Sequence, residues 1–206
     1  MAGVAEYEYG VFMEAAEHVR CWEALSLATR QRDHAFRTPV LLSVDEEGYP
    51  NGRVMTLREA DIERQILRFH LDRRSPKFHH WQSLPVTGAV FYDRHAKWQI
   101  RARGVAQLHY EDDVARVAWS NSHPMCHRTY LTEAAPGEEL DWDVESTYPA
   151  HLLRQRPSAE ELETAYARFA VLLVRVADMD SLHLAGTGHQ RFRIESPSFE
   201  TVRLAP

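Results

Sequence analysis

The order of apolar and polar residues divides the chain into a helical beginning and a longer extended part. Residues 12–31 place apolar side chains at helical intervals, and this spacing predicts one amphipathic helix over that range. From Thr38 onward, short apolar or alternating runs are separated by turn residues, as in β-strands joined by hairpins. We therefore expect strands over residues 40–44, 51–59, 65–71, 86–92, 98–108, 170–176, 190–195 and 199–204.

Three shorter helices are expected between these strands. Ser75 would cap a helix through Ser83. Residues 111–120 have helical character and carry acids in the first turn, where negative charge complements the helix dipole. Ser158 and Glu161 have the spacing of a capping box and would open the third helix.

The pattern as a whole indicates a mainly β protein. Five or six strands joined mostly by short turns favour an antiparallel barrel with helices outside it. Regular strand–helix alternation is missing, and neither GxGxxG nor GxxxxGK(S/T) occurs, which disfavours a Rossmann fold and a P-loop. Residues 132–150 are rich in Pro, Gly and acids and are expected to form a lid-like loop. We predict a single domain over residues 1–206.

Composition indicates which kinds of binding partner and which cellular compartment the sequence is compatible with. A net charge of −6 argues against a nucleic-acid-binding domain, which would normally present a basic face. No apolar run is long enough to span a bilayer, and the N-terminus lacks the basic and apolar regions of a secretory signal. Cys21 and Cys126 lie far apart without CxxC spacing, which fits a reducing compartment. We therefore expect a cytoplasmic protein that binds neither nucleic acid nor membranes.

A cationic cluster stands out on this acidic chain. Residues 53–58 begin and end with arginine, and the strand-like run 65–71 is followed closely by Arg73, Arg74, Ser75 and Lys77. Two neighbouring extended segments can bring these donors to one place, where a phosphate is the natural occupant. Charged strand ends are also commonly solvated, so residue types alone leave an ordinary surface as the alternative.

Four runs in the chain resemble the pyridoxamine 5′-phosphate oxidase family of FMN-binding split β-barrels. They are RVMTLRE (53–59), FHLDRRSPK (69–77), WQIRARG (98–104) and the terminal VRLAP (202–206). Their order and separation also agree with the family. The resemblance implies a six-stranded antiparallel split barrel with flanking helices. Within the family, the chain is more similar to the oxidase-related FMN-binding proteins than to an authentic oxidase.

The resemblance also implies a cofactor, FMN, and the residues that hold it. The family's Ser-Arg-Lys phosphate clamp falls on Ser75, Pro76 and Lys77, so its middle arginine is missing and Arg73 or Arg74 could substitute. In the family FMN lies at a dimer interface, so a homodimer is implied. The cofactor-binding positions that carry over are Arg53, Val54, Met55, Thr56, Leu57, Arg58, His70, Leu71, Ser75, Lys77, Gln99 and Arg191.

The substrate side departs from the family pattern. The family's substrate-phosphate lysine falls on Arg58, which keeps the charge, whereas its Arg-x-His pair becomes Thr187-Gly188-His189. Losing a bidentate arginine is not a neutral change, so vitamin B6 is not favoured as the substrate. The implied substrate-binding residues are Arg58, Trp119, His123 and His189, with a further family position near His127.

Several residues also allow other interpretations. The run from His123 to His127 contains imidazoles and a thiol, but its spacing fits no closed zinc motif, so no metal site is predicted. Ser120, Ser122, His123 and the acids of residues 138–143 have the residue types of a hydrolase triad, yet no GxSxG elbow supports one. Gln99 alternates with apolar neighbours and could simply face outward from an edge strand.

Three functions stay open from the sequence. The first is an FMN-dependent oxidoreductase acting on an unidentified small substrate, with no catalytic acid–base side chain because the flavin supplies the redox chemistry. The second is a non-catalytic flavin-binding or storage protein, since the substrate-phosphate set is incomplete. The third is genuine pyridoxamine or pyridoxine 5′-phosphate oxidation. A deazaflavin or haem in place of FMN is a further alternative for the occupant.

Overall fold

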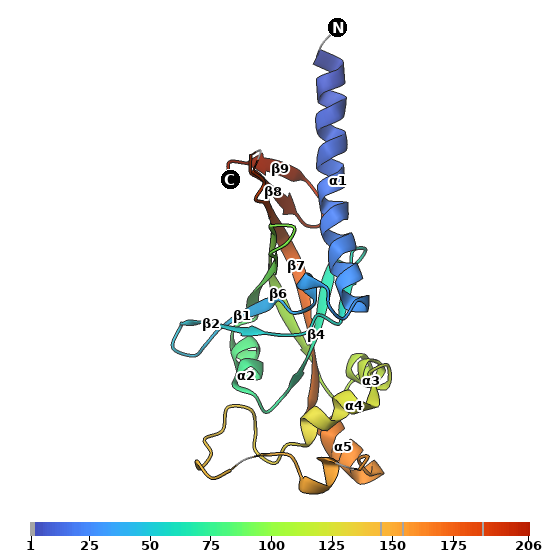
Figure 1. Cartoon of the computed structure of the whole chain (residues 1–206), viewed down its shortest axis with the longest axis vertical. Helices are drawn as coiled ribbons and strands as arrows, with labels where there is room; N and C mark the ends of the chain where they lie inside the picture. Colours follow the sequence, from blue (N-terminus) through green and yellow to red (C-terminus); the bar gives the residue numbers. More distant parts are fainter. Residues whose placement is uncertain (1–2, 145, 154, 187) are drawn as a thin grey trace.

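The computed structural model describes residues 3–144, 146–153, 155–186 and 188–206, without the side chains of residues 3–16 and 153. Its centre is one sheet in which all strand pairs are antiparallel (Figure 1). Within the described residues the strands are β1 (Val40–Val44), β2 (Pro50–Val54), β3 (Glu59–Asp61), β4 (Ile66–Asp72), β5 (Val86–Asp93), β6 (Trp98–His109), β7 (Phe169–His183), β8 (Gln190–Glu195) and β9 (Thr201–Leu204).

The long strand β7 joins the two halves of the sheet. The strand order is β2-β1-β5-β6-β7-β4-β3, and β8 pairs with the far end of β7 while β9 continues from β8. β7 pairs with β4 through residues 169–175 and with β8 through residues 178–183, so one strand serves two different neighbours. The expected mainly β class is confirmed. The expected number of six strands is wrong, because the described sheet has nine and is open.

The register between β6 and β7 shifts at Gly104 for a steric reason. A Cβ atom built on Gly104 would lie 2.1 Å from the carbonyl oxygen of Arg175, which no side chain allows. The irregularity between Arg103 and Gly104 is a β-bulge of the kind that bends and twists a strand. Glycine at this position therefore permits the bend that turns β7 from one neighbour to the next.

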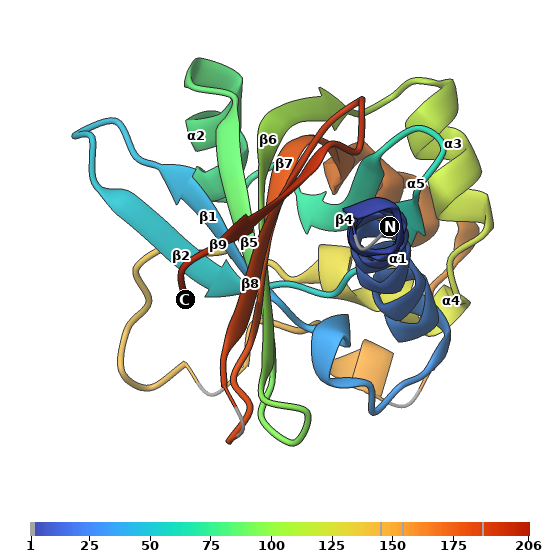
Figure 2. The ribbon, with the colours of Figure 1, turned by 90° about the horizontal axis from the view of Figure 1, so that it is seen from above.

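Five α-helices in the described part flank the sheet. They are α1 (Gly3–Arg30), α2 (Pro76–Ser83), α3 (Asp113–Ser120), α4 (Pro124–His127) and α5 (Ala159–Arg168), with 3₁₀ helices η1 (Ala35–Arg37), η2 (Arg128–Leu131) and η3 (Ala150–Leu153). α1 lies along the sheet near β8 and β9, whereas α3, α4 and α5 gather at the other end of β7 (Figures 1 and 2). The capping box of Ser158 and Glu161 is present as expected.

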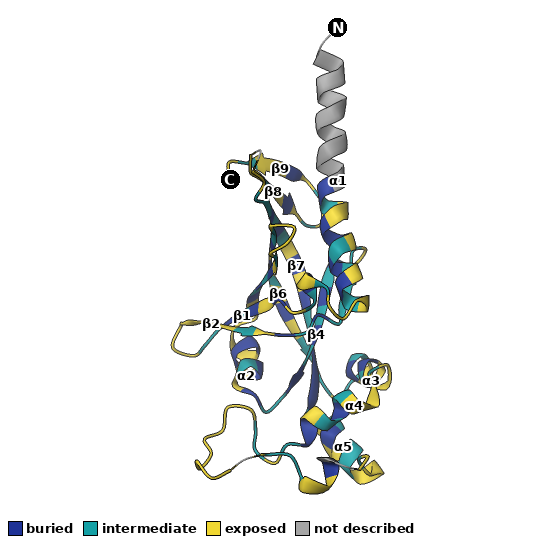
Figure 3. Cartoon of the chain, in the orientation of Figure 1, coloured by how far each residue is buried: buried dark blue, intermediate teal, exposed yellow. Residues whose placement is uncertain are grey.

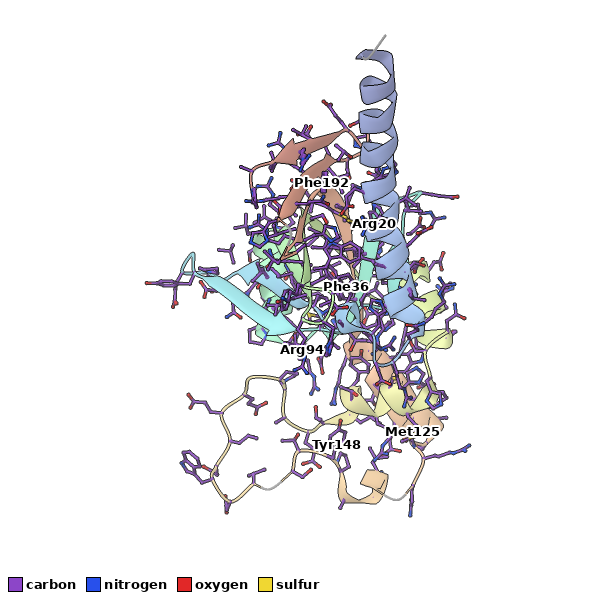
Figure 4. All side chains as sticks on the ribbon, turned by 45° about the horizontal axis from the view of Figure 1, so that its top comes forward. Arg20, Phe36, Arg94, Met125, Tyr148 and Phe192 are labelled. Atoms are coloured by element: carbon purple, nitrogen blue, oxygen red, sulfur yellow. The ribbon has the colours of Figure 1, made fainter. Side chains whose placement is uncertain are left out.

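Two hydrophobic clusters hold these elements together. The larger lies between α1, α2 and the sheet, and Phe36 sits near its middle among the side chains drawn in Figure 4. The smaller joins α3, η2 and α5 to the start of β7 around Tyr130, Leu152 and Phe169. Figure 3 shows buried residues along the strands of the sheet and on the helices that pack against it.

The expected strand over residues 51–59 is wrong in its second half. β2 ends at Val54, and the next residues connect it to β3 without regular pairing. The Met55 N–H donates to the Pro39 carbonyl at 3.0 Å and the Leu57 N–H to the Arg37 carbonyl at 2.8 Å. These contacts with the segment before β1 divert the chain, and the diverted connection forms one wall of the candidate site.

Candidate functional site

One cavity of about 330 Å³ collects most of the residues expected to bind the cofactor. It lies between the β2–β3 connection, the end of β4, the first turn of α2 and the segment around α4 and η2. Eight of the twelve expected cofactor positions line it, namely Arg53, Val54, Met55, Thr56, Arg58, His70, Leu71 and Lys77.

Arg53 is held in a fixed direction at the cavity wall. Its Nη1 donates to Ser43 Oγ at 2.9 Å and its Nη2 to Asn51 Oδ1 at 2.6 Å. The guanidinium carbon lies 5.5 Å from the centre of the Trp81 ring, a cation–π contact. Burial lowers the pKa of Arg53, although a guanidinium stays charged at neutral pH. These contacts bring a positive charge to the cavity without neutralising it.

Lys77 brings a second positive charge to the same cavity from the first turn of α2. Among the described side chains it forms no ion pair within 4 Å. Burial lowers the pKa of Lys77, the nearby charge of Arg53 lowers it further, and Asp72 offsets part of the effect. Arg53 and Lys77 therefore line the same cavity, and Asp72 lines it with them.

Arg58 and His70 add polar groups without partners inside the described part of the chain. Arg58 Nε and His70 Nε2 are buried, and neither has a hydrogen-bond partner there. Burial lowers the pKa of His70 to about 3, helped by the charges of Arg58, Arg68 and His127. His70 is thus a neutral imidazole at physiological pH, and its ring meets Phe169 edge-on at 5.0 Å. Unpaired buried polar atoms beside a cavity favour a polar ligand there.

Ser75, Arg73 and Arg74 are occupied elsewhere. The Ser75 hydroxyl donates to the Asp72 carbonyl at 2.5 Å, which makes Ser75 part of the turn that leads into α2. Arg74 chelates the Asp72 carboxylate, and Arg73 pairs with Glu111 at 2.8 Å. Neither guanidinium therefore replaces the missing arginine of the phosphate clamp, contrary to the expectation from the sequence.

The charge balance of the cavity favours an anion. Arg53, Arg58 and Lys77 supply three cations, and Asp72 is the one carboxylate among the described lining residues. That carboxylate is already engaged by Arg74, which does not line the cavity. A dianionic phosphate would offset the surplus, because charge-assisted hydrogen bonds are strong in partly buried sites.

The cavity includes five residues that were not expected from the sequence. One is Asp72 at the end of β4, and the other four come from the segment after α3, namely Cys126, Thr129, Tyr130 and Pro136. Burial raises the pKa of the Tyr130 phenol, so its hydroxyl stays protonated and can act as a hydrogen-bond donor. No periodic pattern marks the four residues after α3, and only the return of the chain from α4 towards β4 places them beside Arg58.

Three of the residues expected to bind substrate lie outside this cavity. The Trp119 ring stacks on His127 with centroids 3.6 Å apart, inside the smaller hydrophobic cluster. His123 caps α4, with its Nδ1 accepting from the Met125 N–H at 3.2 Å. His189 is exposed just before β8, and Thr187, two positions before it, lies outside the described residues. Only Arg58 of that set lines the cavity.

The remaining expected cofactor residues divide between the core and the opposite end of the sheet. Leu57 is fully buried behind the wall. Gln99 and Arg191 both pair with Leu182 across neighbouring strands, so they lie in one row of the sheet. Arg191 forms an ion pair with Asp180 at 2.9 Å. Within one chain neither Gln99 nor Arg191 lines the cavity.

No group of three or more His, Cys, Asp or Glu side chains in the described part of the chain is arranged to hold a metal ion. None of the helices described combines the length and apolar character that crossing a bilayer requires.

The sequence around the cavity matches a known domain family. Residues 19–110 match the family described as "Pyridoxamine 5′-phosphate oxidase, FMN-binding domain". This segment belongs to that family. It contains β1 to β6 and α2, and hence every element of the cavity wall except those after α3. A search of curated proteins gives no match.

Solved structures extend the likeness of this oxidase-family domain over most of the chain. An FMN-binding, pyridoxamine 5′-phosphate oxidase-related protein from Nostoc punctiforme is 20% identical over 88% of this chain and 94% of its own, with a TM-score of 0.69. PhzG from Burkholderia lata, solved with tetrahydrophenazine-1-carboxylic acid, is 20% identical over 93% and 92%, with a TM-score of 0.66. A general stress protein 26 relative from Clostridium acetobutylicum is 10% identical over 80% and 89%, with a TM-score of 0.53. At these identities the likeness establishes the fold, and it confirms the split-barrel class.

Proposed function

We propose that the protein is an FMN-dependent oxidoreductase that acts on a small organic substrate. The observation that carries this proposal is the convergence of Arg53, Arg58 and Lys77 on one cavity within a segment of the FMN-binding domain family. A phosphate needs such positive partners, and the unpaired buried nitrogens of Arg58 and His70 are suited to a polar ligand. FMN, when bound, supplies the redox chemistry.

The chain's own residues would bind and orient the cofactor. Arg53, held by Ser43 and Asn51, and Lys77 would neutralise the phosphate. The β2–β3 connection, where Val54, Met55 and Thr56 line the cavity, would lie against the flavin ring. Ser75 would act indirectly, because its hydroxyl holds the turn that presents Lys77.

A homodimer is part of the proposal. A cavity of about 330 Å³ is at the small end of ligand sites, so one chain encloses only part of a nucleotide-sized ligand. Gln99, Arg191 and His189 lie together at the far end of the sheet, away from their own cavity. A second copy would bring these groups to the open side of the site.

The substrate would contact the part of the cavity that Arg58, Tyr130, Thr129 and Cys126 line. Arg58 can pair with an anionic substituent, and the protonated Tyr130 hydroxyl can donate a hydrogen bond. Trp119, His123 and His189 do not reach this region in one chain. This arrangement favours a small anionic or polar molecule and does not reproduce the Arg-x-His pair that the family resemblance implies for a vitamin B6 phosphate.

The visible spectrum of the purified protein, followed by stopped-flow reduction, tests the proposal. We expect flavin absorbance bands, and bleaching of these bands by NADH, NADPH or a member of a substrate panel. The double variant Arg53→Ala with Lys77→Ala should lose FMN, whereas Arg64→Ala, a control at a largely exposed arginine, should retain it. A protein that takes up no flavin on titration would contradict the proposal.

Two outcomes of the same experiment distinguish the alternative functions. Bound flavin that no donor reduces would indicate a non-catalytic binding or storage protein. Formation of pyridoxal phosphate from pyridoxamine or pyridoxine phosphate would identify a genuine oxidase. The proposal predicts little or no pyridoxal phosphate.

A further inference from the structure

The loop between η2 and η3 carries an exposed apolar tip. Residues 138–144, which we call the arm, begin with two acids and alternate acidic and apolar side chains from Glu139 onward. Leu140 and Val144 are about half exposed, and Trp142 is fully exposed. In Figure 4 the side chains of this loop spread away from the packed body. An exposed apolar group of this size is typical of a contact surface.

The base of the arm is fixed to its own chain. The Thr132 carbonyl accepts hydrogen bonds from Arg74 at 3.1 Å and from Arg168 at 3.0 Å. The Glu133 N–H donates to the Thr147 carbonyl at 2.8 Å, which closes the loop on itself. These bonds leave the tip beyond residue 137 without a comparable anchor.

The near half of the loop already covers its own cavity. Pro136 lines the cavity, and Gly137 packs so closely on Pro76 that a Cβ would lie 3.3 Å from that ring. The arm starts directly after this contact and extends to the side of the molecule that carries β2 and β9 in both views (Figures 1 and 2). The apolar tip is therefore available to another molecule.

A groove on the outer face of the sheet has the complementary chemistry. It has a volume of about 440 Å³ and runs over β5, β6, β7 and β8, with an apolar floor that includes Leu42, Val90 and Leu204. Its walls carry four arginines, namely Arg101, Arg103, Arg191 and Arg193.

The charges of the arm and the groove are opposite. The four arginines and the two lining carboxylates, Asp178 and Asp180, leave the groove with a net charge of +2. The arm contains four acids, no base and therefore a charge of −4. Arg103 pairs with Asp178 at 2.9 Å yet keeps most of its side chain exposed, so it can also meet an incoming carboxylate.

We infer that the arm of one copy lies in the groove of a second copy. A twofold axis then makes two identical contacts, arm to groove and groove to arm, and the assembly closes as a dimer. The inference deepens the proposed homodimer and rests on it. Trp142 would fill the apolar floor, and the acids of the arm would meet the arginines of the groove.

This contact would also complete the flavin site. Pro136 lines the cavity, and Trp142 follows it six positions later in the sequence, a chain length of at most about 22 Å. If Trp142 of one copy lies in the groove of the second copy, that groove and the Arg191 in it are held within this distance of the first copy's cavity. Arg191 is the residue that the family resemblance places near the flavin, and it does not reach the cavity of its own chain.

Sedimentation velocity of the full-length protein over a range of concentrations tests the inference. We expect Trp142→Ala and the double variant Asp141→Arg with Asp143→Arg to weaken the dimer at least about tenfold, since a buried aromatic anchor or a reversed charge pair costs more than about 1.4 kcal/mol. Val117→Ala removes an exposed apolar side chain on α3, on the opposite side of the molecule, and should not change the dimer.

A charge-swap experiment tests the pairing itself. Arg103→Glu in the groove should weaken the dimer, and mixing it with the Asp141→Arg, Asp143→Arg variant should restore association, because one contact is then doubly reversed and the other is native. Circular dichroism checks that each variant folds. If the groove variant does not fold, the two arm variants still test the inference, because their substitutions lie in an exposed loop.

Three results would overturn the inference. The first is a wild-type chain that stays monomeric, and the second is a dimer that none of the arm variants weakens. The third is a loss of flavin affinity in Trp142→Ala with an unchanged dimer, which would make the arm a lid over its own cavity. Flavin binding is measured separately, so a dimer that binds no flavin would contradict the proposed function and leave the arm contact standing.

Discussion

Ser43 Oγ accepts a hydrogen bond from Arg53 Nη1 at 2.9 Å across the β1–β2 pair. The same hydroxyl lies 3.1 Å from His80 Nδ1 on α2, so it links the sheet to the helix that presents Lys77. Ser43 is buried and does not line the cavity. It thus acts as a positioning residue that aims the arginine at the cavity.

Ser43→Ala should lower FMN affinity by about fivefold to tenfold, because loss of a hydrogen bond to a charged group frees the guanidinium to adopt other directions. Quenching of flavin fluorescence on titration measures the change. Thr87→Val is the matched control, since it removes a hydroxyl on β5 that donates to the Leu42 carbonyl, away from the cavity. Equal affinity in Ser43→Ala and the wild type would argue against a positioning role.

Lys77→Met should stabilise the free protein and weaken flavin binding. The pKa of Lys77 is lower in the folded chain than its usual 10.5, so folding opposes protonation of the ammonium. This energetic cost of keeping Lys77 charged in the folded chain is present at neutral pH, and it disappears as the pH rises from the folded pKa to 10.5. We expect a gain of about 0.5–2 kcal/mol in the free energy of unfolding without FMN. Urea denaturation with and without FMN measures both effects, and a variant less stable than the wild type without ligand would contradict the account.

His70 should stay neutral across the physiological range. Its folded pKa of about 3 lies below the usual 6.5, so below pH 6.5 the unfolded chain binds a proton that the folded chain does not. Stability therefore falls as the pH drops from 6.5 towards 3. His70→Phe should flatten this slope, as measured by urea denaturation at several pH values. An NMR titration in which the His70 imidazole protonates between pH 6 and 7 would refute the prediction.

Glu17 docks α1 on the sheet through a buried network. Its Oε1 accepts from Ser181 Oγ at 2.6 Å and lies 2.8 Å from His183 Nε2, and the Trp98 indole N–H donates to Ser181. Burial alone would raise the pKa of Glu17, but the hydrogen bonds from His183 and Ser181, with the charges of His183 and Arg20, outweigh it. The net pKa lies below the usual 4.5.

This network should make α1 docking sensitive to acid. A carboxylate with a lowered folded pKa stabilises the fold above pH 4.5, and this contribution is lost as the pH falls through the folded value. Glu17→Gln should cost about 1–3 kcal/mol at pH 7 and should remove part of the acid dependence. Glu23→Gln, on an exposed position of the same helix, is the control. Equal acid profiles for Glu17→Gln and the wild type would contradict the assignment.

Much of the fold follows from local pattern. The alternation in residues 98–108 put Ile100 and Ala102 on one face and Arg101 and Arg103 on the other, and the first pair is buried while the second is exposed. The convergence of Arg53 and Lys77 was also predictable, because Arg53 lies near the end of β2 and Lys77 lies in the first turn of the helix that follows β4, and both strands belong to the same sheet. Local spacing of apolar and polar residues is sufficient to predict which face of a strand is buried.

The rest depends on contacts between distant segments. The connection after Val54 leaves the sheet because Leu57 bonds to Arg37, and Arg73 is diverted by Glu111, thirty-eight positions away. Tyr130 reaches the cavity only because the smaller hydrophobic cluster folds its segment back. None of these partners can be read from a local pattern of apolar and polar residues.

The central claim is that Arg53 and Lys77 bind the phosphate of FMN. Titrating the flavin-free protein with FMN and with riboflavin, which lacks the phosphate, tests it most directly. The wild type should bind FMN at least about 30-fold more tightly than riboflavin, since an unpaired buried charge costs 2 kcal/mol or more. In the Arg53→Ala, Lys77→Ala variant this preference should nearly vanish while riboflavin affinity changes little. Equal affinity for the two flavins in the wild type, or an undiminished preference in the variant, would contradict the account.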